Sequence, residues 1–154
     1  MISLRALTPA DVEAVIALAL SALAEIGLER NAASVQRDLE DVDRAYAAPR
    51  GGFWVAETDG VIVGSVAVRP KEGQTAELKR LYVSAAARGR GLGQTLYEHA
   101  EAFARSAGYT KIGLDSSRRF VSARRLSERN GFVVTAELDN EWEDDVYEKM
   151  LDGG

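Results

Sequence analysis

Apolar and polar positions follow two different periods along the chain, and these periods divide it into helices and strands. In the N-terminal part, residues 2–7 alternate, which predicts a short strand. Residues 8–25 carry apolar positions at helical spacing, and the Thr-Pro-Ala-Asp start suits a helix N-terminus because it offers a cap, a first-turn proline and a negative charge. Gly27 ends this helix, and residues 33–46 predict a second one.

The middle and C-terminal parts predict six strands and two more helices. Residues 51–70 form a hairpin, because two β-rich runs meet at the strong turn signal Asp59-Gly60. The elements that follow are a strand over 75–84, a helix over 91–107, a strand over 110–117, a helix over 120–129, and two strands over 132–138 and 144–151 that are expected to pair. The order is β-α-α-β-β-β-α-β-α-β-β, an α/β chain of mixed α+β type. Without repeats or linkers, we expect one domain over residues 1–154.

Composition and charge exclude several classes of site and partner. The 154 residues include no cysteine, which excludes a disulfide, a thiol nucleophile and a thiolate metal site. The lone histidine, His99, excludes a histidine-rich cluster, so no metal is expected. The sequence shows neither an apolar run that spans a membrane nor a signal peptide, so we expect a cytoplasmic protein without a membrane partner. A net charge of -5 argues against nucleic acid as a partner.

The segment between the strand over 75–84 and the helix that follows it is the clearest candidate for chemistry. It reads Arg88-Gly89-Arg90-Gly91-Leu92-Gly93. The first N–H groups of a helix have no internal partner and lie at the positive end of the dipole, and glycines let the backbone approach a phosphate closely. The two arginines would add charge-assisted hydrogen bonds. The strand–turn–helix setting therefore favours an anion site over a plain basic turn.

Two common phosphate motifs do not fit this segment. A P-loop ends in Gly-Lys-Ser or Gly-Lys-Thr, but here Gly93 is followed by Gln94 and Thr95. The dinucleotide fingerprint needs a third glycine three residues after the second, and Leu96 stands at that place. The loop therefore belongs to another class of phosphate site.

Residues 77–115, ELKRLYVSAAARGRGLGQTLYEHAEAFARSAGYTKIGLD, resemble the signature of the GNAT superfamily, the acyl-CoA-dependent N-acetyltransferases. The phosphate loop of that family reads Arg-or-Gln-x-x-Gly-x-Gly-or-Ala, and Arg88, Gly91 and Gly93 match it. The hairpin FWVAETDGVIVGSVAV and the later ARRLSERNGF also resemble the family. The resemblance covers nearly the whole chain, although the first helices match only in layout. It implies a central mixed, mostly antiparallel sheet flanked by helices.

The resemblance also implies the chemistry and the site. Acetyl-CoA would be the cosubstrate, and a primary amine, on a small molecule or a protein, would attack it directly in a ternary complex. The strand before the loop would splay from the next strand at a bulge, pantetheine would lie in the gap, and the N–H of Leu81 would become the oxyanion donor. The sequence leaves open whether the protein also acts as a homodimer. The implied cofactor-binding residues are Leu81, Tyr82, Val83, Arg88, Gly89, Arg90, Gly91, Leu92, Gly93, Gln94 and Thr95.

Glu77 is the carboxylate that stands out, four residues before Leu81, where several family members carry a general base. An acceptor amine is an ammonium ion at neutral pH and must lose a proton before it attacks, and a partly buried carboxylate can take that proton directly or through water. The alternative is an ion pair with Lys79 or Arg80 at a solvated strand edge.

The later helix departs from the family pattern. Phe120 stands where Asn is common, and Ser127 stands where the family usually carries a Tyr that protonates the leaving thiolate. A serine is a far weaker acid with a shorter reach. The proton for the thiolate could instead come from water or from another tyrosine, or the thiolate could leave without one. The sequence does not rank the candidate tyrosines Tyr82, Tyr97, Tyr109 and Tyr147.

Two further features favour structural interpretations. His99 follows Leu92 and Leu96 at helical spacing, which favours packing at the flank of the helix over catalysis. The acidic segment between the last two strands favours a solvated hairpin. Its functional alternative is a funnel for a cationic amine, with Trp142 as a wall. The acidic residues are Glu137, Asp139, Glu141, Glu143, Asp144 and Asp145.

Two functions of different classes therefore remain. The favoured one is an N-acetyltransferase, supported by Glu77 and by Leu81-Tyr82-Val83. The other is a non-catalytic acyl-CoA-binding module, in which Ser127 marks lost chemistry.

Overall fold

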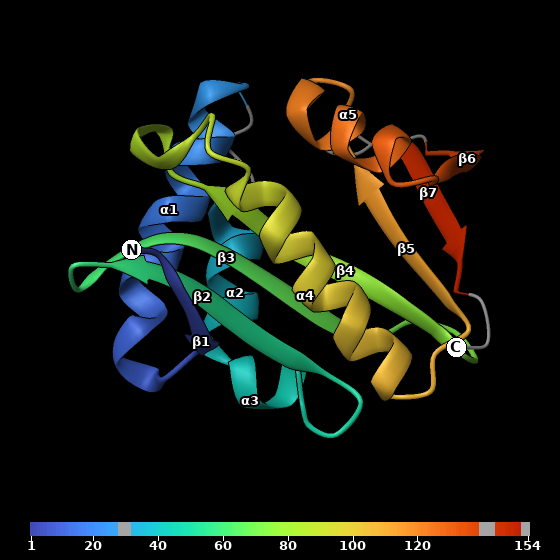
Figure 1. The fold of residues 1–154 in the computed structure, drawn as a ribbon, viewed down its shortest axis with the longest axis horizontal. Coiled ribbons are helices and arrows are strands. Elements are labelled where there is room, and N and C mark those ends of the chain that lie inside the picture. Colours follow the sequence, from blue (N-terminus) through green and yellow to red (C-terminus); the bar gives the residue numbers. More distant parts are fainter. Residues whose placement is uncertain (28–31, 139–143, 152–154) are drawn as a thin grey trace.

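The computed structural model describes residues 1–27, 32–138 and 144–151. Within these ranges the chain forms five α-helices and seven strands (Figure 1). Two short 3₁₀ turns, Pro9–Asp11 and Ala85–Ala87, precede α1 and α4. The elements are β1 (Ser3–Ala6), α1 (Val12–Glu25), α2 (Ala32–Glu40), α3 (Val42–Ala45), β2 (Gly52–Thr58), β3 (Val61–Pro70), β4 (Thr75–Val83), α4 (Leu92–Ser106), β5 (Lys111–Ser116), α5 (Val121–Arg129), β6 (Val133–Glu137) and β7 (Asp145–Met150).

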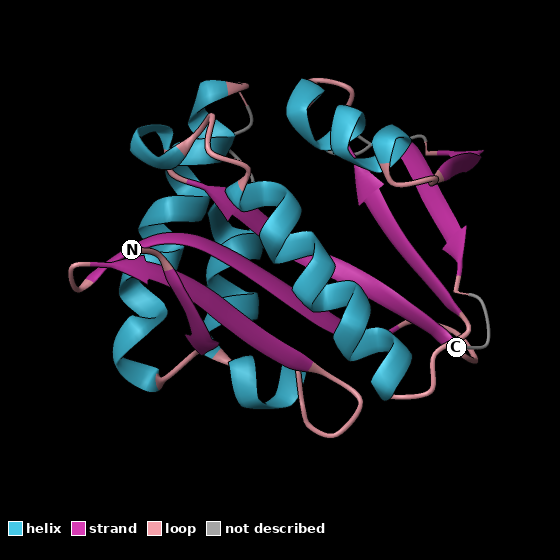
Figure 2. Ribbon diagram, in the orientation of Figure 1, coloured by secondary structure: helices cyan, strands magenta, loops and turns pink. Residues whose placement is uncertain are grey.

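The strands form one seven-stranded sheet in the order β1-β2-β3-β4-β5-β7-β6 (Figure 2). Only the pair β4–β5 is parallel, and all the other neighbours are antiparallel. The parallel pair is possible because α4 connects its strands, as a parallel crossover requires. The predicted mixed, mostly antiparallel sheet is therefore confirmed, as is the pairing of the last two strands.

Helices cover both faces of the sheet, and each face has its own apolar core. On one face α4 crosses β3 and β4 (Figure 1), with Leu96 and Ala100 fully buried against the sheet. On the other face α1 packs through Val15 and Ala19 against the sheet residue Val55. Alternate residues of the central strands therefore enter opposite cores, as the two-residue period of a strand requires.

The helix predicted over residues 33–46 is wrong in one respect. It is broken at Asp41 into α2 and α3. The break lets the chain turn so that Tyr46 reaches the core, where its ring meets Phe53 edge-on with 5.2 Å between ring centroids. The packing of one aromatic side chain overrides the local helical pattern here, as tertiary contacts often do.

Candidate functional site

The site begins where β4 and β5 separate. Their parallel pairing joins only Thr75–Glu77 to Lys111–Gly113, and Figure 1 shows the two strands diverging beyond it. In the part of the chain that the structure describes, the segment 78–83 of β4 runs beside β3 and has no strand on its other side. This segment therefore offers an open row of peptide groups, which an extended ligand can use as a strand edge.

A bulge lies in the middle of this open segment. Lys79 pairs with Ala67 and Tyr82 pairs with Ser65, so β4 carries one extra residue here. Arg80 has φ +56, a left-handed conformation that a non-glycine residue adopts at a cost of about 1–3 kcal/mol. Its carbonyl accepts a hydrogen bond of 2.7 Å from the Ser65 hydroxyl. The splay and bulge implied by the family resemblance are therefore present.

The glycine-rich loop after β4 forms a second open backbone site. Gly89 and Gly91 have φ of +80 and +75, and Gly91 is the N-cap of α4. Among the described residues, no oxygen accepts a hydrogen bond from the N–H groups of residues 89–94. A methyl group added at either glycine would meet no heavy atom within 4 Å, so the space above the loop is open. A helix N-terminus with free N–H groups and open access suits an anion.

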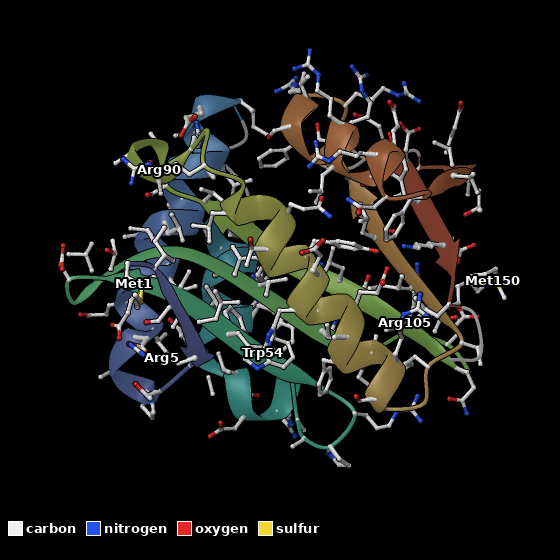
Figure 3. The ribbon with its side chains drawn as sticks, in the orientation of Figure 1. Met1, Arg5, Trp54, Arg90, Arg105 and Met150 are labelled. Atoms are coloured by element: carbon white, nitrogen blue, oxygen red, sulfur yellow. The ribbon has the colours of Figure 1, made fainter. Side chains whose placement is uncertain are left out.

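The two arginines of the loop differ in their contacts. Arg88 forms a two-point ion pair with Glu25 at the end of α1, with N–O distances of 2.6 and 2.8 Å. This hydrogen bond raises the pKa of Arg88 and lowers that of Glu25. Arg90 projects from the loop (Figure 3), is exposed, and has no ion-pair partner among the described residues. Arg90 is therefore the less engaged of the two side chains, and the phosphate-binding role of both arginines stays a prediction.

Glu77 lies on β4 at the last position before the strands separate. It is 8% exposed, and its Oε1 accepts a hydrogen bond of 2.8 Å from Nε of Arg69, its neighbour across the sheet. The alternative of a solvated edge with Lys79 or Arg80 as partner is therefore wrong. Its Oε2 accepts no hydrogen bond from the described residues and is not sealed from solvent. The role as general base stays a prediction.

A pocket of about 330 Å³ lies next to Glu77, between α2, α3, β3 and β4. Its lining is strongly charged, and five of the eight lining residues are basic. The lining residues are Arg37, Asp38, Asp41, Arg44, Ala45, Arg69, Lys79 and Arg80. The pocket opens on the face of the sheet that α1 covers, because Ala67, the sheet partner of Lys79, packs in that core.

Asp38 of α2 connects the pocket to the bulge. Its carboxylate accepts hydrogen bonds from Arg80 at 2.8 Å, from Arg69 at 3.4 Å and from the hydroxyl of Tyr46. Burial and the hydrogen bond to Asp38 raise the pKa of Tyr46, so the phenol stays protonated. The contacts to Asp38 and Ser65 hold Arg80 from both ends, which is how a strained residue persists in a fold.

The hydroxyl of Ser127 is already engaged. It is 1% exposed and donates a hydrogen bond of 2.9 Å to the carbonyl of Ala123, one turn earlier in α5. Among the tyrosines, Tyr97 hydrogen-bonds Glu101 and Tyr109 donates to the backbone of Arg50. The remaining candidates are Tyr82, which lies on the open segment of β4, and Tyr147 of β7, whose pKa is raised mainly by burial.

The other sequence candidates lie outside the site or outside the described residues. His99 is exposed, and its ring meets Trp54 at 4.9 Å between centroids. Residues 139–143, which include Trp142 and three of the six acidic residues of that segment, lie outside the described residues. The described acidic residues of that segment, Asp144, Asp145 and Glu137, surround Arg118.

Two features are absent from the described residues. No helix in the described ranges combines the length and the apolar character needed to cross a membrane. No three side chains of the metal-ligating types come together anywhere in residues 1–27, 32–138 and 144–151.

The sequence interpretation missed the side chains of the pocket. Asp38 and Arg80 are 42 positions apart, and no local pattern links them. One weak signal existed, because α2 carries Arg37 and Asp38 next to each other, but such a pair is ordinary on a solvated helix.

Comparisons with known proteins agree with this geometry. The sequence model of the acetyltransferase (GNAT) family matches residues 20–132. N-acetyltransferase family 8 member 2 of Rattus norvegicus is 39% identical over 106 residues, which cover 66% of this chain and 47% of the relative. N-acetylaspartate synthetase of the same organism is 36% identical over 101 residues, which cover 64% of this chain and 34% of the relative. The chain thus spans half or less of these curated relatives.

Solved structures share the fold. A GNAT-family acetyltransferase from Staphylococcus aureus Mu50 superimposes with a TM-score of 0.89 at 21% identity, covering 97% of this chain and 99% of that one. The PaiA N-acetyltransferase from Thermoplasma acidophilum, solved in complex with coenzyme A, gives a TM-score of 0.79 at 24% identity, covering 98% and 99%. This sheet with helices on both faces is therefore a known architecture.

Proposed function

The chain belongs to the acetyltransferase (GNAT) family, and on that premise we propose that it transfers an acetyl group from acetyl-CoA to a primary amine by direct attack in a ternary complex. One observation carries the proposal. The open edge of β4 runs directly into a loop whose N–H groups at residues 89–94 have no described acceptor. The pantetheine arm of CoA suits the open strand edge, and the pyrophosphate at its end suits the loop.

The proposed binding mode uses backbone groups throughout. Pantetheine adds to the open edge of β4 through the peptide groups of Leu81 and Val83, as in strand addition. The pyrophosphate lies on the N–H groups of the loop and the N-terminus of α4, where the helix dipole favours negative charge. Arg90 adds a charge from the loop.

The chemical step then takes place at the bulge. The acceptor nitrogen loses a proton to Glu77, directly or through water, and attacks the thioester carbonyl. The N–H of Leu81 stabilises the oxyanion, and the carbon–sulfur bond breaks as the oxyanion collapses to the amide carbonyl. The thiolate of CoA leaves and takes up, through water, the second proton that the nitrogen loses when the amide forms. Direct attack is favoured over an acyl-enzyme because the chain has no cysteine to carry the acetyl group.

Thiol release from acetyl-CoA in the presence of a panel of primary amines tests this proposal. Amino acids belong in the panel because one relative carries the name N-acetylaspartate synthetase. We expect amine-dependent thiol release and intersecting lines when both substrates are varied. Parallel lines would indicate a covalent intermediate and would contradict direct attack.

A second function is favoured by one observation. The hydroxyl of Ser127 is bonded to its own helix where the family usually places a catalytic Tyr, which suits a non-catalytic acyl-CoA-binding module. That function predicts a rise in melting temperature with acetyl-CoA but no thiol release with any amine.

A further inference from the structure

We propose that the acceptor amine also carries a carboxylate, as a free α-amino acid does, and that the basic pocket beside β4 binds this carboxylate. The inference rests on the proposed function, because it names the class of amine that the same site acetylates. It comes from the charge, the position and the size of the pocket.

The pocket has more positive than negative charge. Its five basic residues face the carboxylates of Asp38 and Asp41 in the lining and that of Glu77 beside it. Asp38 forms ion pairs with Arg69 and Arg80, and Arg69 also pairs with Glu77. Asp41 pairs with Arg44. Among the described residues, Arg37 and Lys79 have no ion-pair partner. Two positive charges are therefore left over for a ligand.

This excess is local, because the whole chain carries a net charge of -5. A concave site of one sign concentrates ligands of the opposite sign. A purely cationic amine would meet like charges there, which disfavours its binding. An amine that also carries a carboxylate can form ion pairs with Arg37 and Lys79.

The position of the pocket suits the reaction. Lys79 and Glu77 lie on the same face of β4, opposite Ala67 and Arg69, and Arg80 forms the bulge between them and the loop. A carboxylate held at Lys79 leaves the amine of the same small molecule close to Glu77 and the thioester. Nearby cations also favour the neutral amine, the form that attacks.

The pocket does not serve the phosphates of CoA in this arrangement. Lys79 precedes Val83 by four residues, which is about 13 Å along a strand, and the loop beyond Val83 has its own free N–H groups. The volume of about 330 Å³ is at the small end of ligand pockets, which suits a molecule of amino-acid size.

Matched acceptors test the inference directly. Each α-amino acid is compared with its α-amide and with the amine that lacks the carboxyl group, using the full chain and acetyl-CoA. We expect kcat/KM to be roughly tenfold to hundredfold higher for the acid, the range that a charged hydrogen bond supplies. A ratio near one would overturn the inference while leaving the acetyltransferase function intact. If no amine is acetylated at all, the proposed function itself fails.

Two variants locate the carboxylate. Arg37→Gln and Lys79→Gln should each lower the ratio between acid and amide about tenfold, with coenzyme A affinity by calorimetry close to wild type. Arg125→Gln, which removes an equal charge from the surface of α5, is the matched control and should keep the ratio. The inference is overturned if Lys79→Gln weakens coenzyme A binding and leaves the ratio unchanged, because the pocket would then bind phosphate.

Discussion

The glycine-rich loop and the basic pocket lie at the two ends of the open part of β4, but they are built by opposite means. The loop is contiguous and presents backbone N–H groups at residues 89–94 around two glycines with positive φ. The pocket brings side chains from α2, α3, β3 and β4 together through ion pairs. A backbone site can accept the same phosphate in many relatives, whereas a side-chain site changes with single substitutions. We therefore expect the loop to define the cosubstrate and the pocket to define the acceptor.

The largest expected effect comes from closing the loop. Gly91→Glu places a carboxylate in the open space where the pyrophosphate is expected, and like charges in a desolvated site cost several kcal/mol. Coenzyme A affinity should fall at least about hundredfold by calorimetry, with a modest change in folding.

Gly60→Glu is the matched control for that variant. Gly60 has φ +77, close to the +75 of Gly91, and a Cβ at this position would also meet no heavy atom within 4 Å, but Gly60 lies in the β2–β3 turn. It should show the same backbone strain and keep wild-type affinity. Wild-type affinity in Gly91→Glu would refute the assignment of the loop.

The second largest effect is expected at Glu77, where a substitution should lower turnover without weakening acetyl-CoA binding. Glu77→Gln keeps the shape of the side chain and removes the proposed base, so turnover should fall roughly hundredfold with acetyl-CoA affinity little changed. The deficit should shrink as the pH rises, because more of the acceptor is then already neutral. Steady-state rates across a pH series measure both effects.

Glu57→Gln provides the comparison for the loss of an ion-paired carboxylate in the sheet. Glu57 of β2 pairs with Arg5 of β1 at 3.2 Å, and β3 separates it from β4 in the strand order. Its replacement should affect stability only. A Glu77→Gln enzyme with the wild-type rate at neutral pH would show that water or another residue is the base.

A smaller effect tests how the pocket supports the bulge. Asp38→Asn weakens the contacts to Arg80 and Arg69, and we expect a loss of about 1–3 kcal/mol in the free energy of unfolding. Turnover should fall roughly tenfold, because a displaced backbone at Arg80 misplaces the neighbouring N–H of Leu81. Urea unfolding and single-turnover rates measure the two losses.

Asp41→Asn removes the other carboxylate of the pocket at a more exposed position. It pairs with Arg44 at 3.6 Å, with 57% of its side chain exposed, and such pairs contribute little. Its unfolding free energy should stay within about 0.5 kcal/mol of wild type. Equal losses in the two variants would mean that Asp38 does not support the bulge.

The smallest effect is expected at Ser127. Its hydroxyl donates a hydrogen bond to the carbonyl of Ala123, and a thiolate leaving group needs little help at neutral pH. Ser127→Ala should therefore change turnover less than about threefold. A tenfold loss with folding intact would show that the serine takes part in the reaction.

The order of elements followed from the sequence because most signals were local. Asp59-Gly60 marked the β2–β3 turn, and the glycines around residue 91 marked the start of α4, where the structure places them. The break at Asp41 did not follow, because its cause is the packing of Tyr46 against Phe53 in the core. A helical pattern carries no information about such a distant contact.

The same distinction applies to the site. The loop was predictable because its function depends on glycines and a helix start within a few residues. The buried ion pair of Glu77 with Arg69 and the link between Asp38 and Arg80 were not, because they join elements that only the sheet and α2 bring together. The position of Glu77 was expected from the family resemblance, but its partner was not.

Amide hydrogen exchange with and without acetyl-CoA tests most directly whether the backbone loop, and not the basic pocket, binds the cosubstrate. We predict slower exchange in peptides that cover residues 78–83 and 88–95, with little change in residues 37–45 of the pocket. Protection confined to residues 37–45, with none at 88–95, would contradict the account, because the cosubstrate would then occupy the site assigned to the acceptor.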